Sequence, residues 1–90
     1  MMNDEVILSY LEELAEKLEI LVRDENINIE ESSSSGGLCR VEGKHVIILN
    51  SKSSVKEKIQ VMIAALQQFD LRDMYIKPVI RELLEGSVQV

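Results

Sequence analysis

The stretch LCRVEGKHVIILN, residues 38–50, contains two runs of β-branched and aliphatic residues that are separated by Glu42 and Gly43. A two-residue connection with glycine at its second position is typical of a β-hairpin. The stretch therefore predicts an antiparallel hairpin. Amphipathic helices are predicted on both sides of it, so the expected fold class is α+β, a small antiparallel sheet with this hairpin at its centre, packed against the helices.

The expected two-residue turn also fixes which side chains share a face of the hairpin. One face carries Leu38, Arg40, His45, Ile47 and Leu49, and the other carries Cys39, Val41, Val46 and Ile48. Both faces are therefore apolar near the open end of the hairpin. We expect helices to cover one face, and a protein partner or a second copy of the chain to cover the other.

Two helices flank the hairpin. In residues 3–18 apolar side chains recur every three or four positions, and Asn3 or Asp4 is suited to cap the first turn. After the hairpin, Ser54 and Glu57 have the spacing of a capping box. The stripe of apolar residues that follows them, at helical spacing, predicts a second helix ending near Gln68.

The remaining segments complete the predicted order α-β-(β)-β-β-α-α in one domain, residues 1–90. Alternation around Val22 predicts a strand, and Ile27 with Ile29 predicts an optional second one. The segment SSSSGG, residues 32–37, is expected to be a flexible loop. Pro78 fits the first turn of a last helix and Gly86 its end, which leaves residues 87–90 as a tail.

The composition excludes several functional classes. The net charge of −6 argues against binding to nucleic acid or to an anionic membrane. Cys39 is the only cysteine, and the start MMNDEV is acidic where a signal peptide is basic, so we expect a cytoplasmic protein. A chain of 90 residues has a thin core, which favours a homodimer or a protein partner.

The segment SSSSGGLCR, residues 32–40, raises the question of catalysis. Its glycines precede a strand and no lysine follows them, so it does not match a phosphate-binding loop. Cys39 and His45 are a nucleophile and a base, but the expected register directs them to opposite faces. One cysteine and one histidine are too few for a zinc site. We therefore expect no catalytic residue, no metal and no cofactor.

Candidate ligand or interface residues remain around the hairpin and in the segment RDMYIKP, residues 72–78. They are Gly36, Gly37, Leu38, Cys39, Arg40, His45, Ile47, Leu49, Arg72 and Tyr75. The residues on the hairpin offer an apolar face and a sheet edge. Arg72 and Tyr75, with the nearby Lys77 and Arg81, offer a place for an acidic group.

Three segments, LEILVR, GGLCRVEGKHVIILN and SSVKEKIQVMIAALQQF, together resemble the ImmA/IrrE-type metallopeptidase domain. The resemblance implies a helix, a short strand, a hairpin and then a helix that carries HExxH in that family. In the best register the zinc-binding pair and the glutamate fall on Ala64, Gln68 and Ala65. None of these side chains can perform the zinc chemistry. The resemblance therefore implies a peptidase-like shell without its catalytic site.

The function expected from the sequence is thus that of a noncatalytic domain that self-associates or binds a protein partner. The alternative is an enzyme or ligand-binding protein that uses Cys39, His45 and the Ser/Gly loop. One structural observation distinguishes the two hypotheses: the alternative requires the side chains of Cys39 and His45 to lie close together.

Overall fold

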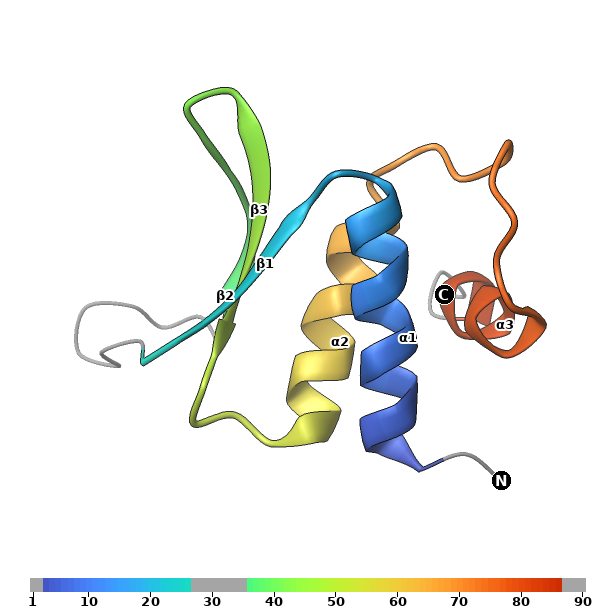
Figure 1. The fold of residues 1–90 in the computed structure, drawn as a ribbon. Coiled ribbons are helices and arrows are strands. Elements are labelled where there is room, and N and C mark those ends of the chain that lie inside the picture. The colour runs from blue at the N-terminus through green and yellow to red at the C-terminus, as the bar shows by residue number, and fades with distance from the viewer. Residues whose placement is uncertain (1–2, 27–35, 87–90) are drawn as a thin grey trace.

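The computed structural model describes residues 3–26 and 36–86 (Figure 1). The elements follow in the order α1 (Asp4–Lys17), β1 (Leu21–Glu25), β2 (Gly36–Val41), β3 (Lys44–Asn50), α2 (Val55–Leu66) and α3 (Pro78–Gly86). The predicted α+β class is confirmed. The optional strand at Ile27 and Ile29, and the predicted tail, lie outside the described residues.

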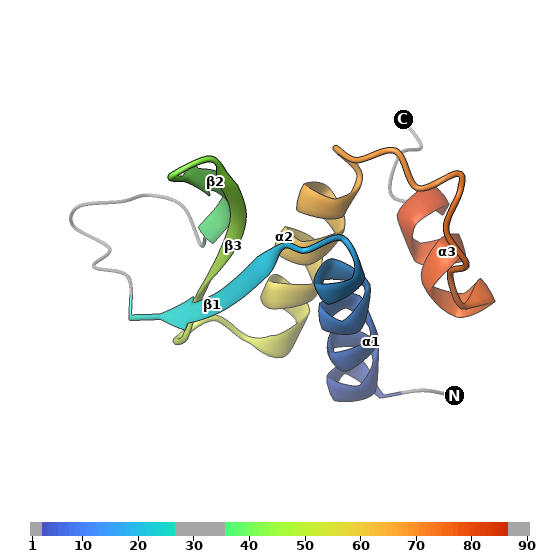
Figure 2. The same ribbon diagram turned by 45° about the horizontal axis from the view of Figure 1, so that its top comes forward.

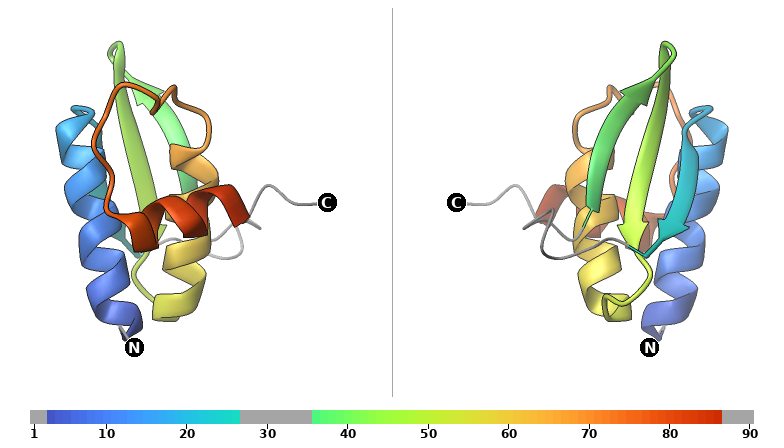
Figure 3. Two further views of the ribbon diagram at one scale, coloured as in Figure 1. Left: turned by 90° about the vertical axis from the view of Figure 1, so that its right-hand side faces the viewer. Right: turned by 90° about the vertical axis from the view of Figure 1, so that its left-hand side faces the viewer.

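The elements form three layers (Figures 1 and 2). The sheet is the first layer, α1 and α2 pack side by side on one of its faces, and α3 lies against the other side of these two helices. Figure 3 shows α2 behind β2 and α1 behind β1. The core between sheet and helices is aliphatic, and its fully buried members include Leu11, Ile47, Leu49, Met62 and Leu66.

The sheet is mixed, which corrects the prediction of a purely antiparallel sheet. Its strand order is β1-β3-β2, with β1 parallel and β2 antiparallel to β3. The physical reason is that β3, with its continuous apolar run VIIL, gains most from burial at the centre of the sheet. The segment between β1 and β2 is long enough to place β2 one strand away from β1, so that β3 fits between them.

The hairpin has the predicted turn and register. Glu42 and Gly43 have φ of 53° and 81°, the left-handed values that a type I′ turn requires. Val41 pairs with Lys44, and the register continues to Gly36 opposite Leu49. One boundary was wrong: Gly36 and Gly37 were placed in the loop of residues 32–37, but they are the first residues of β2. Gly36 and Gly37 pair with Leu49 and Ile48, so the hairpin register carries β2 into them despite the low strand propensity of glycine.

The helix ends follow the predicted capping chemistry. Asn3 Oδ1 accepts a hydrogen bond from the Val6 amide at 2.9 Å, and Ser54 with Glu57 forms a complete capping box. At the end of α1, Glu19 has φ of 62°, and the Ile20 amide donates to the Ala15 carbonyl at 2.9 Å. This Schellman ending turns the chain directly from α1 into β1.

Candidate functional site

A groove of about 340 Å³ lies between strand β2 and helix α2. Gly37 and Leu38 form one wall, and Glu57, Gln60, Val61, Ala64, Ala65 and Gln68 form the other. Ala64 is exposed, while Ala65 is buried beneath it. The groove is open because the helix presents small side chains here, and its volume falls within the range of ligand sites in proteins.

No described strand pairs with the edge of β2 that lies along this groove. Strand β2 is an edge strand, and its only strand partner among the described residues is β3. In a hairpin with a two-residue turn, the residues flanking the turn exchange both hydrogen bonds, and the pairs then alternate. Because Val41 and Lys44 flank the turn, Leu38 and Arg40 direct their N–H and C=O groups away from β3. These groups lie beside the groove.

Side chains of opposite charge lie towards the two ends of β2, and of these only Glu57 lines the groove itself. Glu57 lies in the first turn of α2, and Figure 1 shows that α2 starts at the end of the sheet where β2 begins. Arg40 lies near the other end of β2, on the same face as Leu38 because the two are separated by two positions. Arg40 is exposed and forms no ion pair with any described residue. It is therefore available to an acidic partner.

Cys39 and His45 do not meet. Cys39 pairs with Val46 while His45 pairs with Arg40, so the two side chains leave the hairpin on opposite faces. His45 instead packs edge-on against Phe69, with ring centroids 5.0 Å apart. The nucleophile and base of the alternative hypothesis are therefore not assembled into a dyad.

Two further candidates, Ile47 and Leu49, are fully buried in the core beneath α1 and α2. They stabilise the fold and have no surface to offer a ligand. Leu38 is partly buried at the edge of the same core and contributes one wall of the groove. Within the candidate set, Gly37, Leu38 and Arg40 thus lie together along the groove side of β2.

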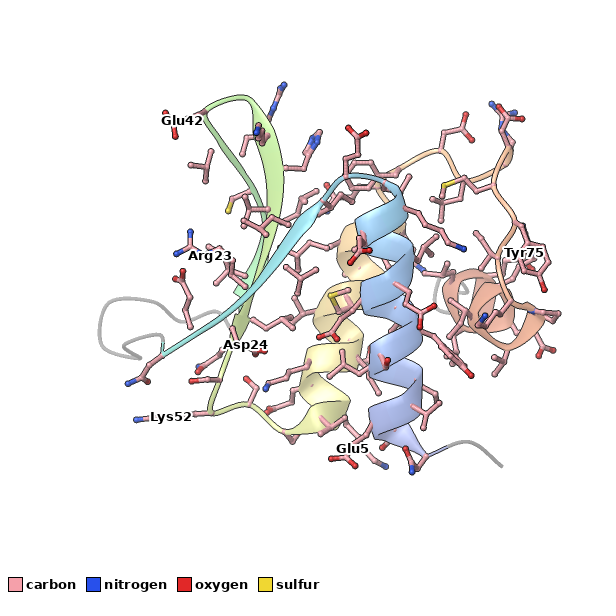
Figure 4. All side chains as sticks on the ribbon, in the orientation of Figure 1. Glu5, Arg23, Asp24, Glu42, Lys52 and Tyr75 are labelled. Carbon is pink, nitrogen blue, oxygen red and sulfur yellow. The ribbon has the colours of Figure 1, made fainter. Side chains whose placement is uncertain are left out.

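The candidates in residues 72–78 are divided between two places. Arg72 donates two hydrogen bonds of 3.0 Å to the Asp70 carboxylate, which lower the pKa of Asp70. Tyr75 is 73% exposed and lies beside α3 (Figure 4), where the hollow that it shares with Tyr10 holds only about 20 Å³. That is the size of a single water molecule. Lys77 lies over the Tyr10 ring at 4.8 Å from its centroid. This region therefore does not gather free cations around one site.

An acidic hollow of about 330 Å³ lies between α1 and β1. It is lined by Glu12, Glu16 and Asp24, and the Lys58 ammonium is 3.2 Å from Asp24 Oδ1. Partial burial, and to a lesser extent the charge of Asp24, raise the pKa of Glu12. In residues 3–26 and 36–86, no cluster of three or more His, Cys, Asp or Glu side chains is arranged to hold a metal ion.

The outer face of the sheet is apolar and is not covered by any of the three described helices (Figure 3). It carries Cys39, Val41, Val46 and Ile48, as predicted, together with Leu21 of β1. Leu21 is 57% exposed and Val41 is 44% exposed. Arg23 also projects from this face, away from the helices (Figure 4), and pairs with Glu25 at 2.6 Å.

Comparison with protein-family models, with curated proteins and with solved structures gave no match for this chain. Among the residues that the structure describes, no helix is long and apolar enough to cross a membrane.

Sequence reasoning missed the helical wall of the groove. It assigned the apolar stripe of α2 to the core, and the buried residues Ile59, Met62, Ile63 and Leu66 confirm that stripe. The neighbouring stripe of Gln60, Ala64 and Gln68 was the available signal, because it is uncharged and the small Ala64 at its centre leaves space beside an edge strand.

Proposed function

We propose that this chain is a noncatalytic domain that binds a partner protein in the groove between β2 and α2. The observation that carries the proposal is the proximity of three features: an open groove, a strand edge that pairs with no other described strand, and Arg40 near the groove, which forms no ion pair with a described residue. An unpaired edge is a natural attachment site for another chain. The single cysteine supports a reducing compartment, and we infer that the protein acts in the cytoplasm.

The side chains at the three positions of the family's zinc ligands and glutamate support a binding role. Ala64, Ala65 and Gln68, onto which the ImmA/IrrE resemblance maps the zinc ligands and the glutamate, all line this groove. Two of them end in a methyl group, which neither ligates zinc nor transfers a proton. The kinship with that family is part of the proposal. If it holds, the groove keeps a binding surface in a domain without the peptidase chemistry.

A photo-crosslinking amino acid at Gln60 tests the proposal in cells. We expect a discrete heteromeric adduct at this exposed groove position, and we expect Ala64→Trp to abolish it by filling the groove. The matched control is the same photo-crosslinker at Lys56, which is exposed on α2 but does not line the groove. No adduct from Gln60, or an adduct that survives Ala64→Trp, contradicts the proposal.

Self-association through the outer face of the sheet is a second candidate function, supported by the exposure of Leu21 and Val41. Two such faces stack at about 10 Å and bury their apolar centres against each other. Light scattering across a dilution series measures it directly. A dimer mass that Val41→Asp reduces to that of a monomer supports this candidate, and a monomer at every concentration eliminates it.

A further inference from the structure

We propose that the groove binds an extended segment of another protein, which adds to β2 as a fourth strand and presents an acidic side chain to Arg40. This inference rests on the proposed function and specifies its partner. The alternative occupants are a folded surface without strand pairing and a second copy of this chain.

The backbone of β2 argues for an added strand. Leu38 and Arg40 offer two N–H donors and two C=O acceptors on the free side of the sheet, spaced for a strand and for no other regular structure. A helix or a globular surface has no matching row of backbone groups. A segment in β conformation along the edge would pair these four groups with backbone groups and close the adjacent groove.

Helix α2 limits how a second copy could pair at this edge. Figure 3 shows α2 behind β2, and it contacts both β2 and β3. If two copies joined their β2 strands antiparallel into one sheet, these strands would be about 4.8 Å apart, and both α2 helices would lie on the same face of the sheet. Packed helices need about 8–10 Å between their axes. A strand that has no helix of its own beside it meets no such constraint, so the edge favours an isolated extended segment.

The walls of the groove define the side chains of this segment. Alternate residues of an added strand point to the helix side of the sheet. The residue beside Leu38 faces Val61 and Ala64, which leave room for a medium-sized apolar side chain. The residue beside Arg40 meets a guanidinium that forms no ion pair with a described residue, and a carboxylate is its complement.

Strand direction sets the order of these two side chains. Antiparallel pairing is slightly more stable per residue than parallel pairing. An antiparallel segment enters at the turn end of β2, so it meets Arg40 before Leu38. The inferred recognition pattern, from N- to C-terminus, is therefore acidic–any–apolar.

Two capped heptapeptides of identical composition serve as probes: acetyl-Ser-Thr-Glu-Thr-Leu-Thr-Ser-amide and the version in which Glu and Leu are exchanged. We expect the first to bind about fivefold more tightly, a difference of the size of one exposed ion pair. In amide NMR spectra of the full chain, the Leu38 and Arg40 amide signals should move most. Equal binding, or tighter binding of the exchanged peptide, overturns the inferred order.

Charge exchange provides the matched variants. Arg40→Glu should weaken the first peptide about fivefold, and a peptide with Lys in place of its Glu should recover the affinity on this variant. Lys44→Glu makes the same charge change on the opposite face of the hairpin and should leave both affinities unchanged. Loss of binding from Lys44→Glu as large as that from Arg40→Glu contradicts the inference.

The experiments separate the failure of this inference from the failure of the proposed function. If the Gln60 adduct forms and Ala64→Trp removes it, but neither peptide moves the Leu38 and Arg40 signals, the groove binds a protein without strand addition. That result overturns the present inference alone. If the adduct itself is absent, the proposed function fails with it.

Discussion

Ile47 and Ile48 are neighbours in β3 with the same side chain, yet they lie in different surroundings. Ile47 is fully buried between the sheet and the helices, whereas Ile48 is on the outer face and remains partly exposed. Both faces of the hairpin are apolar in sequence, but only one is covered by the described helices. The difference teaches that apolar content alone does not define the core under the helices: Ile47 belongs to it, whereas Ile48, Val41 and Leu21 on the outer face remain partly exposed, although Val46 on that face is buried.

The largest change in stability is expected from alanine substitution at each of the two isoleucines, which tests this comparison. Ile47→Ala should lower the free energy of unfolding by about 2–5 kcal/mol, because it removes buried contacts and leaves a cavity. Ile48→Ala should cost clearly less, since its side chain keeps part of its contact with solvent. Urea denaturation measures both. Equal losses would mean that the outer face is as well packed as the inner one.

The turn that assigns the two isoleucines to their faces provides the next test. Gly43→Ala should cost about 1–2 kcal/mol because alanine is strained at φ of 81°, although its methyl group would meet no neighbour within 4 Å. Glu42→Asn should stabilise the protein by a few tenths of a kcal/mol, because asparagine tolerates the left-handed region better than glutamate.

Gly86→Ala is the control for the turn experiment, because its new methyl group also meets nothing and its backbone does not have positive φ. It should leave the midpoint of thermal unfolding unchanged or slightly raised. A loss of stability as large as that of Gly43→Ala would show that the turn geometry is not the cause.

A smaller effect is expected on the outer face. Leu21→Ser combined with Val41→Thr should change the stability of the monomer by less than about 0.5 kcal/mol per site, because both side chains are largely in water. Thermal unfolding at low protein concentration measures it. A larger loss of stability that increases with protein concentration would identify the outer face as a contact between copies of the chain.

The smallest effect concerns the charged rim on the helix side. Because the pKa of Glu12 is raised in the folded protein, the folded state binds this proton more tightly than the unfolded chain. Ionisation of Glu12 therefore costs stability at neutral pH. Glu12→Gln should raise the free energy of unfolding at pH 7, and this gain should fade as the pH falls below the ordinary pKa of glutamate.

Glu13→Gln is the control for that experiment, since it removes one negative charge from an exposed position on the same helix. If Glu13→Gln raises the free energy of unfolding as much as Glu12→Gln does, the effect comes from overall charge. If the increase caused by Glu12→Gln persists at acid pH, ionisation of Glu12 is not its cause.

Much of the fold was predictable because it depends on local chemistry. Ser54 with Glu57 marked the start of α2, Pro78 marked the start of α3, and Glu42 with Gly43 set the hairpin register. The parallel pairing of β1 with β3 was not predictable, since it depends on which strand takes the centre of the sheet. The groove was also missed, because it arises only when the small side chains of α2 are placed beside the free edge of β2.

The central position of β3 has a consequence for how the chain folds. Strand β1 pairs only with β3 among the described strands. Leu21 therefore cannot pair until Val46, which lies 25 positions later in the chain, is in place. The hairpin contacts are local, and hairpins of this kind close within about 1–10 μs. We therefore expect β2 and β3 to form first and to provide the template on which β1 docks. On the ribosome, β1 would emerge early and remain without a partner until β3 follows it.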